Sequence, residues 1–523
     1  MEKRAYLSFI DDKISKPDLT EHEKAVFILH DQLNVDVWPS WVREEKPLLI
    51  FMESGAKGSS LPYHKKKLIY LLSSMRHFAL ECAEAGFPVY YHSTQHHYDS
   101  GLNKVLSENG HLNVTFMNPS EWDSRERLRK VGAGCEGRVK EIPNNFFLAD
   151  PGEYIDRVKD GWLMEYFYRE MRRKTGYLMN GKKPEGGEWN YDDQNREKLP
   201  KDHPVPTIAE TDPDEITKEV IEMVEEWFPD HFGESENFTY AVTRRQALYR
   251  LNEFIDERLD EFGPYEDAMA QGKYDLFHSH LSVYLNNGLI LPKEACDKAE
   301  EAYQNGNARL NSVEGFIRQI IGWREYVRGY YEAMMPDVRK VNHFNFTHKL
   351  PEMYWTGETK MNCMSECLKP VIKQGYSHHI PRLMVLSNFS NLTETDPREL
   401  NRWFHLAYVD AYEWVVLPNV LGMSTFADGG VLASKSYVSS GNYINKMSDY
   451  CKHCEYKISK KTGEEACPFN YLYWNFIDKQ RETFTQNGRA NFMVNMFDKK
   501  SDEEKKAISE SSVDFLEGVS RYK

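Results

Sequence analysis

Three cysteines near the end of the chain restrict its fold more than any other sequence feature. Cys451 and Cys454 are separated by two residues, and Cys467 follows after a charged stretch of twelve more. Two thiolates at this spacing can bind one metal centre from a single turn, and a third can reach it from the far end of the loop. A fourth ligand must come from elsewhere, and Cys363 or Cys367 in the segment MNCMSEC is the obvious donor. The spacing leaves zinc and an iron–sulfur cluster both open.

Length and charge restrict the class of protein. A chain of 523 residues is too long for one core, so we expect two or three domains. The net charge of -15 argues against a protein that coats nucleic acid indiscriminately, although a local basic groove remains possible. There is no signal-peptide pattern and no apolar run of about 18 residues. We therefore expect a monomer in the reducing cytoplasm, with no membrane partner, where cysteines favour metal over disulfides.

Residues 24–160 have the pattern of a parallel α/β domain, and residues 1–23 form an N-terminal extension without a clear period. The expected elements are strands at 25–30, 47–52 and 88–92 and a helix over 63–85. This alternation predicts βαβ units, whose ligands bind beyond the carboxyl ends of the strands. Asp31 and Glu53 follow two such ends, where they either bind a ligand or cap helices. A nucleotide-binding G-x-G-x-x-G motif does not occur here.

Residues 161–214 form a basic connection between domains. Its first part is helical and carries the cations Arg169, Arg172, Arg173, Lys174, Lys182 and Lys183. These side chains either follow a phosphate backbone or cover a solvated helix face. The rest is rich in Gly, Pro, Asn and Asp, which is typical of a long loop between domains.

Residues 215–523 show successive amphipathic helices and no strands, which predicts a larger, all-helical domain. Ser279 and Ser282 lie beside a probable helix start, where they either bind a phosphate or cap the helix. His378 and His379 are adjacent to each other and close to Arg382. Taken alone, either histidine is more simply a buried structural residue.

The motifs and their order resemble the photolyase/cryptochrome superfamily, and in particular its prokaryotic iron–sulfur branch of bacterial cryptochromes and (6-4) photolyases. The matching segments are SHLSVYL (279–285), IIGWREY (320–326), HHIPR (378–382), DAYEWVVLPNVLGM (410–423) and GNYINKMSDYC (441–451), followed by the cysteine spacing. The resemblance runs from about residue 25 to the end. It implies an α/β antenna domain and an all-helical FAD domain that repairs UV-damaged DNA with light.

The resemblance also implies roles for individual residues. The expected FAD contacts are His278, Ser279, Ser282, Gln319, Arg382 and Asp410, with the last two paired beside the flavin ring. The expected ligands of a 4Fe-4S cluster are Cys363, Cys451, Cys454 and Cys467, which leaves Cys367 free. Asp31 and Glu53 would hold an antenna, either 6,7-dimethyl-8-ribityllumazine or another chromophore, if one is present.

The expected repair reaction begins when photoexcited reduced flavin gives an electron to a flipped (6-4) pyrimidine photoproduct. His379, together with His378, would transfer the proton at the lesion. The residues expected to contact the substrate are Asp192, Arg196, Asp267, Trp323, Tyr437 and Tyr443. The residues expected to carry electrons to the flavin are Trp403, Trp355 and Tyr412.

Three positions depart from the family pattern. Val416 stands where a polar residue commonly faces flavin N5, Lys57 replaces a carboxylate of the antenna pocket, and Phe404 replaces a tyrosine beside Trp403. Two other functions remain open at this point. One is a cryptochrome photoreceptor with the same cofactors and little or no repair, and the other is a metal-stabilised DNA-binding protein without photochemistry.

Overall fold

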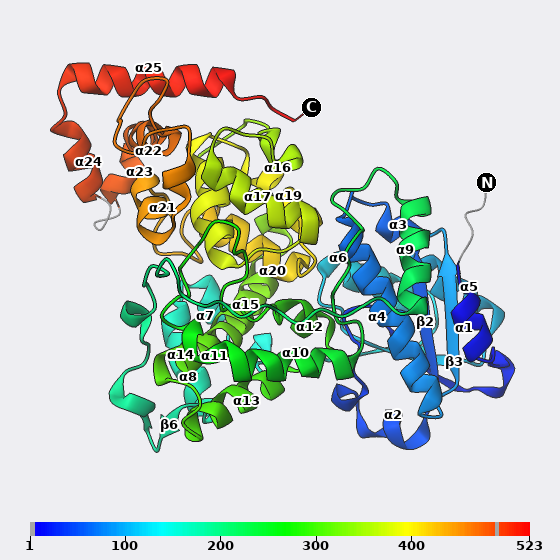
Figure 1. The fold of residues 1–523 in the computed structure, drawn as a ribbon. Helices are drawn as coiled ribbons and strands as arrows, with labels where there is room; N and C mark the ends of the chain where they lie inside the picture. The colour runs from blue at the N-terminus through cyan, green and yellow to red at the C-terminus, as the bar shows by residue number, and fades with distance from the viewer. Residues whose placement is uncertain (1–5, 487–490, 523) are drawn as a thin grey trace.

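The computed structural model describes residues 6–486 and 491–522. A parallel sheet with its covering helices forms one part of the molecule, and a larger helical body forms the other (Figure 1). The predicted α/β domain followed by an all-helical domain is therefore confirmed. In the described residues, no helix is long and apolar enough to cross a membrane.

The sheet has five parallel strands in the order β3-β2-β1-β4-β5. The strands are β1 (Lys24–Ile28), β2 (Leu48–Ser54), β3 (Val89–Thr94), β4 (Asn113–Met117) and β5 (Val139–Ile142). The chain order reverses between β1 and β4, and a doubly wound sheet binds its ligands beyond the strand ends at such a point. The expected strands and the expected helix, α4 (Lys65–Glu84), are present within one or two residues at most ends.

Alternate residues of the central strands pack against opposite helical layers, as the two-residue period of a strand requires. Ala25, Phe27, Leu48 and Ile50 share a core with α5 (Tyr98–Glu108) and α6 (Trp122–Ala133). Val26, Ile28, Leu49 and Phe51 face α4 and belong to the core that continues into the helical body. Both faces of the sheet are therefore buried, which explains its continuous apolar runs.

The sequence did not predict the positions of two segments, the N-terminal extension and the helix that begins at residue 215. The N-terminal extension contains a short helix, α1 (Ser8–Lys13), whose Ser8 backbone N–H donates to Glu219 Oε1 over 2.9 Å. Glu219 belongs to α9 (Glu215–Trp227), which packs beside α4 of the α/β part instead of joining the helical body (Figure 1). The buried face of α9, which includes Val220, Met223 and Val224, explains this position. Polar contacts add to it, since His77 on α4 contacts Asp214 at 2.7 Å and Lys65 contacts Glu225 at 2.9 Å.

The basic connection packs mainly against the helical body. It follows α7 (Ile155–Lys159) and comprises α8 (Met164–Thr175) and a hairpin of β6 (Met179–Asn180) and β7 (Lys183–Pro184). Arg172 is fully buried and donates to the carbonyls of Leu178 and Trp189, so it anchors the loop instead of facing solvent. Arg169 pairs with Glu165 at 2.8 Å, while Arg173 lies over the Trp189 ring at 4.7 Å.

The helical body consists of many short helices around one core. Its longer helices are α10 (Arg244–Glu257), α13 (Pro292–Gln304), α14 (Leu310–Ile317), α15 (Glu325–Met334), α17 (Asn362–Gln374), α19 (Pro397–Ala407), α22 (Pro468–Lys479), α24 (Asn491–Asp498) and α25 (Asp502–Gly518). Its shorter helices are α11 (Leu259–Phe262), α12 (Ser282–Asn287), α16 (Met353–Thr356), α18 (Asn388–Leu392), α20 (Glu413–Leu417), α21 (Gly441–Met447) and α23 (Arg481–Gln486). No named strand occurs in this body among the described residues.

Three π-helical segments interrupt these helices. They are η6 (Arg318–Arg324), η8 (Pro381–Ser387) and η9 (Pro418–Ser424). Each overlaps or adjoins one of the motif segments that carry the family resemblance. A π-helical turn is uncommon and frequently marks a functional site, so these segments point to the centre of the helical body.

Candidate active site

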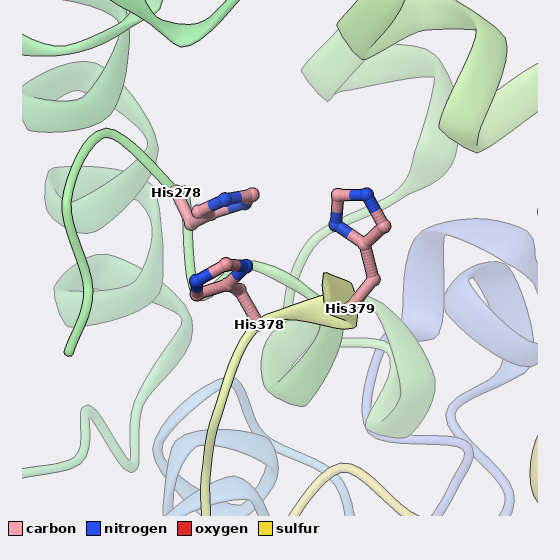
Figure 2. Close-up of side chains that lie close together, drawn as sticks. All are labelled: His278, His378 and His379. Atoms are coloured by element: carbon pink, nitrogen blue, oxygen red, sulfur yellow. The ribbon is translucent and has the colours of Figure 1, made fainter. Parts of the chain in front are cut away.

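Three histidines from two distant segments meet in the helical body (Figure 2). His278 lies on the loop before α12, and His378 and His379 lie just before η8. The rings of His278 and His378 are stacked, with centroids 4.0 Å apart and planes 13° apart, whereas His379 stands edge-on to both. Their ligand atoms lie within 4.8 Å of one another. Stacked imidazoles cannot direct two in-plane lone pairs at one ion, so we assign no metal to this group.

The three histidines differ in their ability to exchange a proton. Burial lowers the pKa values of His278 and His378 well below the usual range, so both rings are neutral near pH 7. The Nδ1 atom of His378 is buried and has no hydrogen-bond partner among the described residues. His379 is 46 % exposed at its side chain, and its Nε2 lies 3.6 Å from Asp267 Oδ1. His379 is therefore the member of this group whose side chain is open to solvent or to a bound molecule.

Asp267 is the centre of the polar cluster around His379. It accepts a hydrogen bond from Tyr443 Oη at 3.4 Å, and Arg196 Nε lies 4.0 Å away. Arg196 also approaches Asp192 at 3.9 Å, and Asp192 pairs with the buried Arg318.

Tyr437 lies close enough to Asp192 for that carboxylate to act on its phenol, and Trp323 on η6 is half-buried. Burial raises the pKa values of Tyr437 and Tyr443, so both phenols remain hydrogen-bond donors at neutral pH. The structure thus brings five of the six expected substrate residues into one network. These five are Asp192, Arg196, Asp267, Tyr437 and Tyr443.

A buried carboxylate, Glu266, supports the histidines from the opposite side. Its backbone carbonyl lies 3.1 Å from His278 Nε2, and its side chain accepts from Gln319 and Asn195, each at 3.0 Å. Burial raises the pKa of this carboxyl group, and nearby charges from His379 and Arg318 oppose that rise. Glu266 thus fixes the orientation of Gln319, one of the residues expected to contact FAD.

An arginine–aspartate pair forms the most rigid part of the site. Arg382 donates to both oxygens of Asp410 at 3.1 and 3.0 Å, and Ser282 Oγ donates to Asp410 at 2.7 Å. Burial opposes the charge of the guanidinium, but Asp410 outweighs this effect and raises the pKa of Arg382. The side chain of Ser279, three residues earlier, accepts from Leu281 N–H at 3.3 Å. The predicted pairing of Arg382 with Asp410 is present.

This group of residues has the chemistry that a flavin requires. A charge pair can face the polar edge of the ring, and hydroxyl groups can receive the phosphates. Arg258 is 1 % exposed, and its Nε has no hydrogen-bond partner among the described residues, so a buried donor is available beside His278. Unpaired buried donors are costly, and an anionic ligand would satisfy one here.

Four cysteines line a small cavity with apolar walls. They are Cys363, Cys451, Cys454 and Cys467. Cys367 is buried outside this lining, one turn further along α17, and contacts Tyr450. A Cβ added at Gly441 would lie 2.9 Å from Cys467 Sγ, so the chain approaches that sulfur closely.

The four sulfurs share one cavity, so together they can bind a single metal centre. Thiolates are ligands of zinc and of iron–sulfur clusters alike, so this lining fits either centre.

A second cavity lies between the α/β part and the helical body, beyond the carboxyl ends of β1 and β2. Its walls include His30, Glu53, Lys57, Lys67, Glu121, Tyr63, His405 and Tyr412. Glu53 accepts hydrogen bonds from Arg76 and Tyr91, each at 2.6 Å, so these two residues hold its carboxylate in the wall of the cavity. Asp31 is buried and accepts from Ser120 N–H at 3.4 Å, but it does not line the cavity.

The cavity contains one pair of opposite charges that neutralise each other, and polar groups that could bind a ligand. Lys57 pairs with Glu121 at 2.9 Å, and this partner lowers the pKa of Glu121 against the effect of burial. Burial lowers the pKa of Lys67 to about 7, and its Nζ donates to two backbone carbonyls. His405 Nδ1 and Tyr412 Oη have no hydrogen-bond partner among the described residues. An aromatic ligand with polar edges would fit these walls.

The expected electron-transfer residues do not lie in one row. Trp403 is fully buried, with Tyr354 edge-on at 5.1 Å, and its Nε1 donates to the Tyr354 carbonyl at 3.1 Å. Trp355 follows directly in sequence. Tyr412 instead lines the cavity between the two parts, where its ring stacks on His30 at 5.9 Å.

Comparisons with known proteins agree with this architecture. A family model described as deoxyribodipyrimidine photo-lyase-related protein matches residues 26–240. A (6-4) photolyase from Agrobacterium fabrum is 44% identical over 472 residues, which cover 89% of this chain and 93% of the relative. The chain belongs to the photolyase/cryptochrome superfamily.

Solved structures of this superfamily share the fold. A class III photolyase from Agrobacterium tumefaciens matches with a TM-score of 0.56 at 15% identity, over 91% of this chain and 98% of that one. A cryptochrome from Synechocystis matches with a TM-score of 0.57 at 12% identity, over 95% and 98% of the two chains. At these identities the two structures support the photolyase fold alone.

Sequence reasoning missed several residues of the photolyase site. Glu266 and Arg258 have no recognisable motif, because a buried charged residue in a helical region looks like any surface charge until its burial is known. Glu266 directly precedes Asp267 in the segment YEDAM, and that acidic pair is the one signal that could have suggested it.

Proposed function

We propose that this protein is a light-driven (6-4) photolyase, in which His379 transfers a proton at the lesion. The observation that carries this proposal is the position of His379. It is the exposed member of a histidine group, next to Asp267, and it lies within a network of expected DNA contacts. The 44% identity to a (6-4) photolyase over most of both chains supports the same reaction.

The residues around His379 have separate tasks in this proposal. Asp267 orients the imidazole, because its Oδ1 lies 3.6 Å from His379 Nε2. Tyr437 keeps its proton and donates a hydrogen bond to the flipped photoproduct, and Tyr443, whose proton is donated to Asp267, accepts one from it. A damaged base pair is easier to extrude, because its stacking and pairing are already weakened. His378 and His278 remain neutral, and their stacked rings form the wall of the pocket on the side that receives the lesion.

FAD is the cofactor that best fits the residues around Arg382 and Asp410. Bound FAD, reduced and excited by light, supplies the electron that begins repair. The Arg382–Asp410 pair would hold the flavin ring, and Ser282 fixes Asp410 in place. His278, Ser279 and Gln319 complete the proposed contacts. Val416, in α20, offers the flavin no hydrogen bond, so its side chain sets the redox balance differently from a polar residue.

Cys363, Cys451, Cys454 and Cys467 are the proposed ligands of a 4Fe-4S cluster. Thiolates are the preferred ligands of such clusters, and the four sulfurs line one cavity with apolar walls. The cluster would join α17 to the C-terminal segment, because Cys363 lies on α17 and the other three lie between 450 and 468. Its proposed role is structural support of the repair pocket.

The cavity between the two parts is the proposed antenna site. Its position beyond the strand ends, its aromatic walls and the free polar atoms of Tyr412 and His405 support this assignment. The candidate chromophore is 6,7-dimethyl-8-ribityllumazine. Lys57 is neutralised by Glu121 in this cavity, so a cation at this position does not by itself exclude a neutral chromophore.

Substitution of His379 tests the proposal directly. The reduced protein is illuminated with an oligonucleotide that contains one (6-4) photoproduct, and the restored pyrimidines are measured by chromatography. We expect His379→Ala to keep its flavin, its iron and its lesion binding but to lose repair. His111→Ala, at an exposed position on the α/β part, is the matched control and should repair like the wild type. Undiminished repair by His379→Ala would remove the proton-transfer role, and lesion binding without repair by the wild type would favour a photoreceptor.

A further inference from the structure

The C-terminal tail places a tyrosine against one of the expected electron-transfer tryptophans. The ring of Tyr522 stacks on Trp355 with centroids 4.3 Å apart and planes 24° apart. Tyr522 is 47 % exposed, Trp355 is half-buried, and Trp403 is fully buried. The three side chains therefore form a series from the surface to the interior.

Hydrogen bonds of the backbone hold this tail in place. The N–H of Tyr522 donates to the Leu350 carbonyl at 3.0 Å, and the N–H of Glu352 donates to the Ser520 carbonyl at 2.9 Å. Arg521 donates to the Lys349 carbonyl at 2.9 Å. The stacking of Tyr522 on Trp355 is therefore supported by hydrogen bonds of residues 520–522 and does not depend on ring contact alone.

A direct connection joins Trp355 to Trp403. The indole N–H of Trp403 donates at 3.1 Å to the Tyr354 carbonyl, which belongs to the peptide group that leads into Trp355. One hydrogen bond and one peptide group thus link the two tryptophans. Trp355 also contacts Phe232, whose ring is nearly perpendicular to the indole at a centroid distance of 5.9 Å. Phenylalanine is not readily oxidised, so Tyr522 is the oxidisable ring that stacks on Trp355.

We propose that Tyr522 is the surface end of an electron-transfer route that runs through Trp355 to Trp403 and the flavin. This inference rests on the proposed function, because the route needs bound, photoexcited oxidised FAD as the electron acceptor. Trp403 gives one electron to the flavin, takes one from Trp355, and Trp355 takes one from Tyr522. The phenol loses its O–H proton to water as its electron leaves, so one phenoxyl radical and one proton remain at the surface. A soluble thiol later returns an electron and a proton to the phenoxyl oxygen.

The environment of Trp355 favours transfer to Tyr522 over a stable tryptophan radical. Its Nε1 is buried and has no hydrogen-bond partner among the described residues. An oxidised indole that cannot pass its N–H proton to a neighbouring base retains its positive charge, and it remains a strong oxidant for the stacked phenol. The exposed phenol can lose its proton to water, which makes the last step difficult to reverse.

Radical spectroscopy on the flavin-loaded protein tests this route. Oxidised protein is flash-illuminated without an external reductant, and radicals are identified by transient absorption and electron paramagnetic resonance. We expect a tyrosyl signal in the wild type, loss of that signal in Tyr522→Phe, and a tryptophan radical in its place. Tyr522→Phe keeps the stacked ring, and Tyr249→Phe, which changes a 63 % exposed tyrosine on α10, is the control that should resemble the wild type.

The outcomes separate this inference from the proposed function. A tyrosyl signal that persists in Tyr522→Phe would overturn the inference, as would a wild type that forms only tryptophan radicals. In either case, repair by chemically reduced protein would leave the proposed function intact. A purified protein that binds no flavin would overturn both.

Discussion

His64 gives a quantitative prediction about stability. This residue precedes α4 and joins the two parts of the molecule, because its backbone N–H donates to the Leu406 carbonyl at 2.8 Å. Its Nε2 lies 3.0 Å from the Ile372 carbonyl, and its Nδ1 accepts from Lys66 N–H at 3.1 Å. Both ring nitrogens are thus used by the neutral form, with the proton on Nε2. A Cβ added at Gly233 would lie 2.1 Å from Nε2, so the ring fills its site completely.

Burial lowers the pKa of His64 from 6.5 to about 3. Below pH 6.5 the unfolded chain binds a proton at this position that the folded chain does not, so stability falls as the pH falls. The contribution of neutral His64 to the free energy of unfolding is complete above pH 6.5, and it is lost progressively as the pH falls toward the pKa of the folded state. At about pH 5 the expected loss of unfolding free energy is roughly 2 kcal/mol relative to about pH 7.5.

The variant His64→Gln isolates this contribution. The glutamine amide can replace the Nε2 donor to Ile372, but it cannot titrate. Urea unfolding followed by tryptophan fluorescence at the two pH values should show an acid loss about 2 kcal/mol smaller in the variant than in the wild type. His111→Gln, at an exposed position, should match the wild type. An equal acid loss in the wild type and His64→Gln would refute the reasoning.

Three further predictions concern the cofactor and substrate residues. Cys363→Ser should lose iron and destabilise the helical body, whereas Cys367→Ser should keep its iron, and full iron content in Cys363→Ser would make Cys367 the fourth ligand. Asp410→Asn should lower flavin content, because breaking a buried charge pair costs about 3 kcal/mol, and unchanged flavin absorbance would contradict the proposed contact. Tyr443→Phe should weaken binding of a (6-4) oligonucleotide about fivefold, since one hydrogen bond contributes about 1 kcal/mol. Binding is measured by fluorescence anisotropy, and an unchanged affinity would exclude the contact.

The sequence predicted the elements that have strong local patterns. The apolar runs of β1 and β2 and the long helix α4 follow from strand and helix periodicity, and the structure places them as expected. The position of α9 could not be predicted, because it depends on contacts such as His77–Asp214 and Lys65–Glu225 between distant segments. Nor could the sequence show that α1 contacts α9.

The same contrast holds for the site. The family resemblance predicted His379, Asp410 and the four cysteines, and the structure places those cysteines around one cavity. The sequence could not show that Tyr412 faces the cavity between the two parts, because the non-helical segment 408–412 sets the direction of this side chain. Tyr522 and Trp355 are far apart in the sequence, and only the folded position of the C-terminal tail shows that their rings are in contact.

The most direct test of the central claim is a comparison of two lesions in one experiment. The reduced wild-type protein is illuminated with oligonucleotides that contain either a (6-4) photoproduct or a cyclobutane dimer, and the restored pyrimidines are quantified by chromatography. A (6-4) photolyase should restore the (6-4) substrate in the light, fail in the dark, and leave the cyclobutane dimer largely unrepaired. Light-dependent repair of the cyclobutane dimer alone, or repair of neither lesion by flavin-loaded protein, would contradict the account.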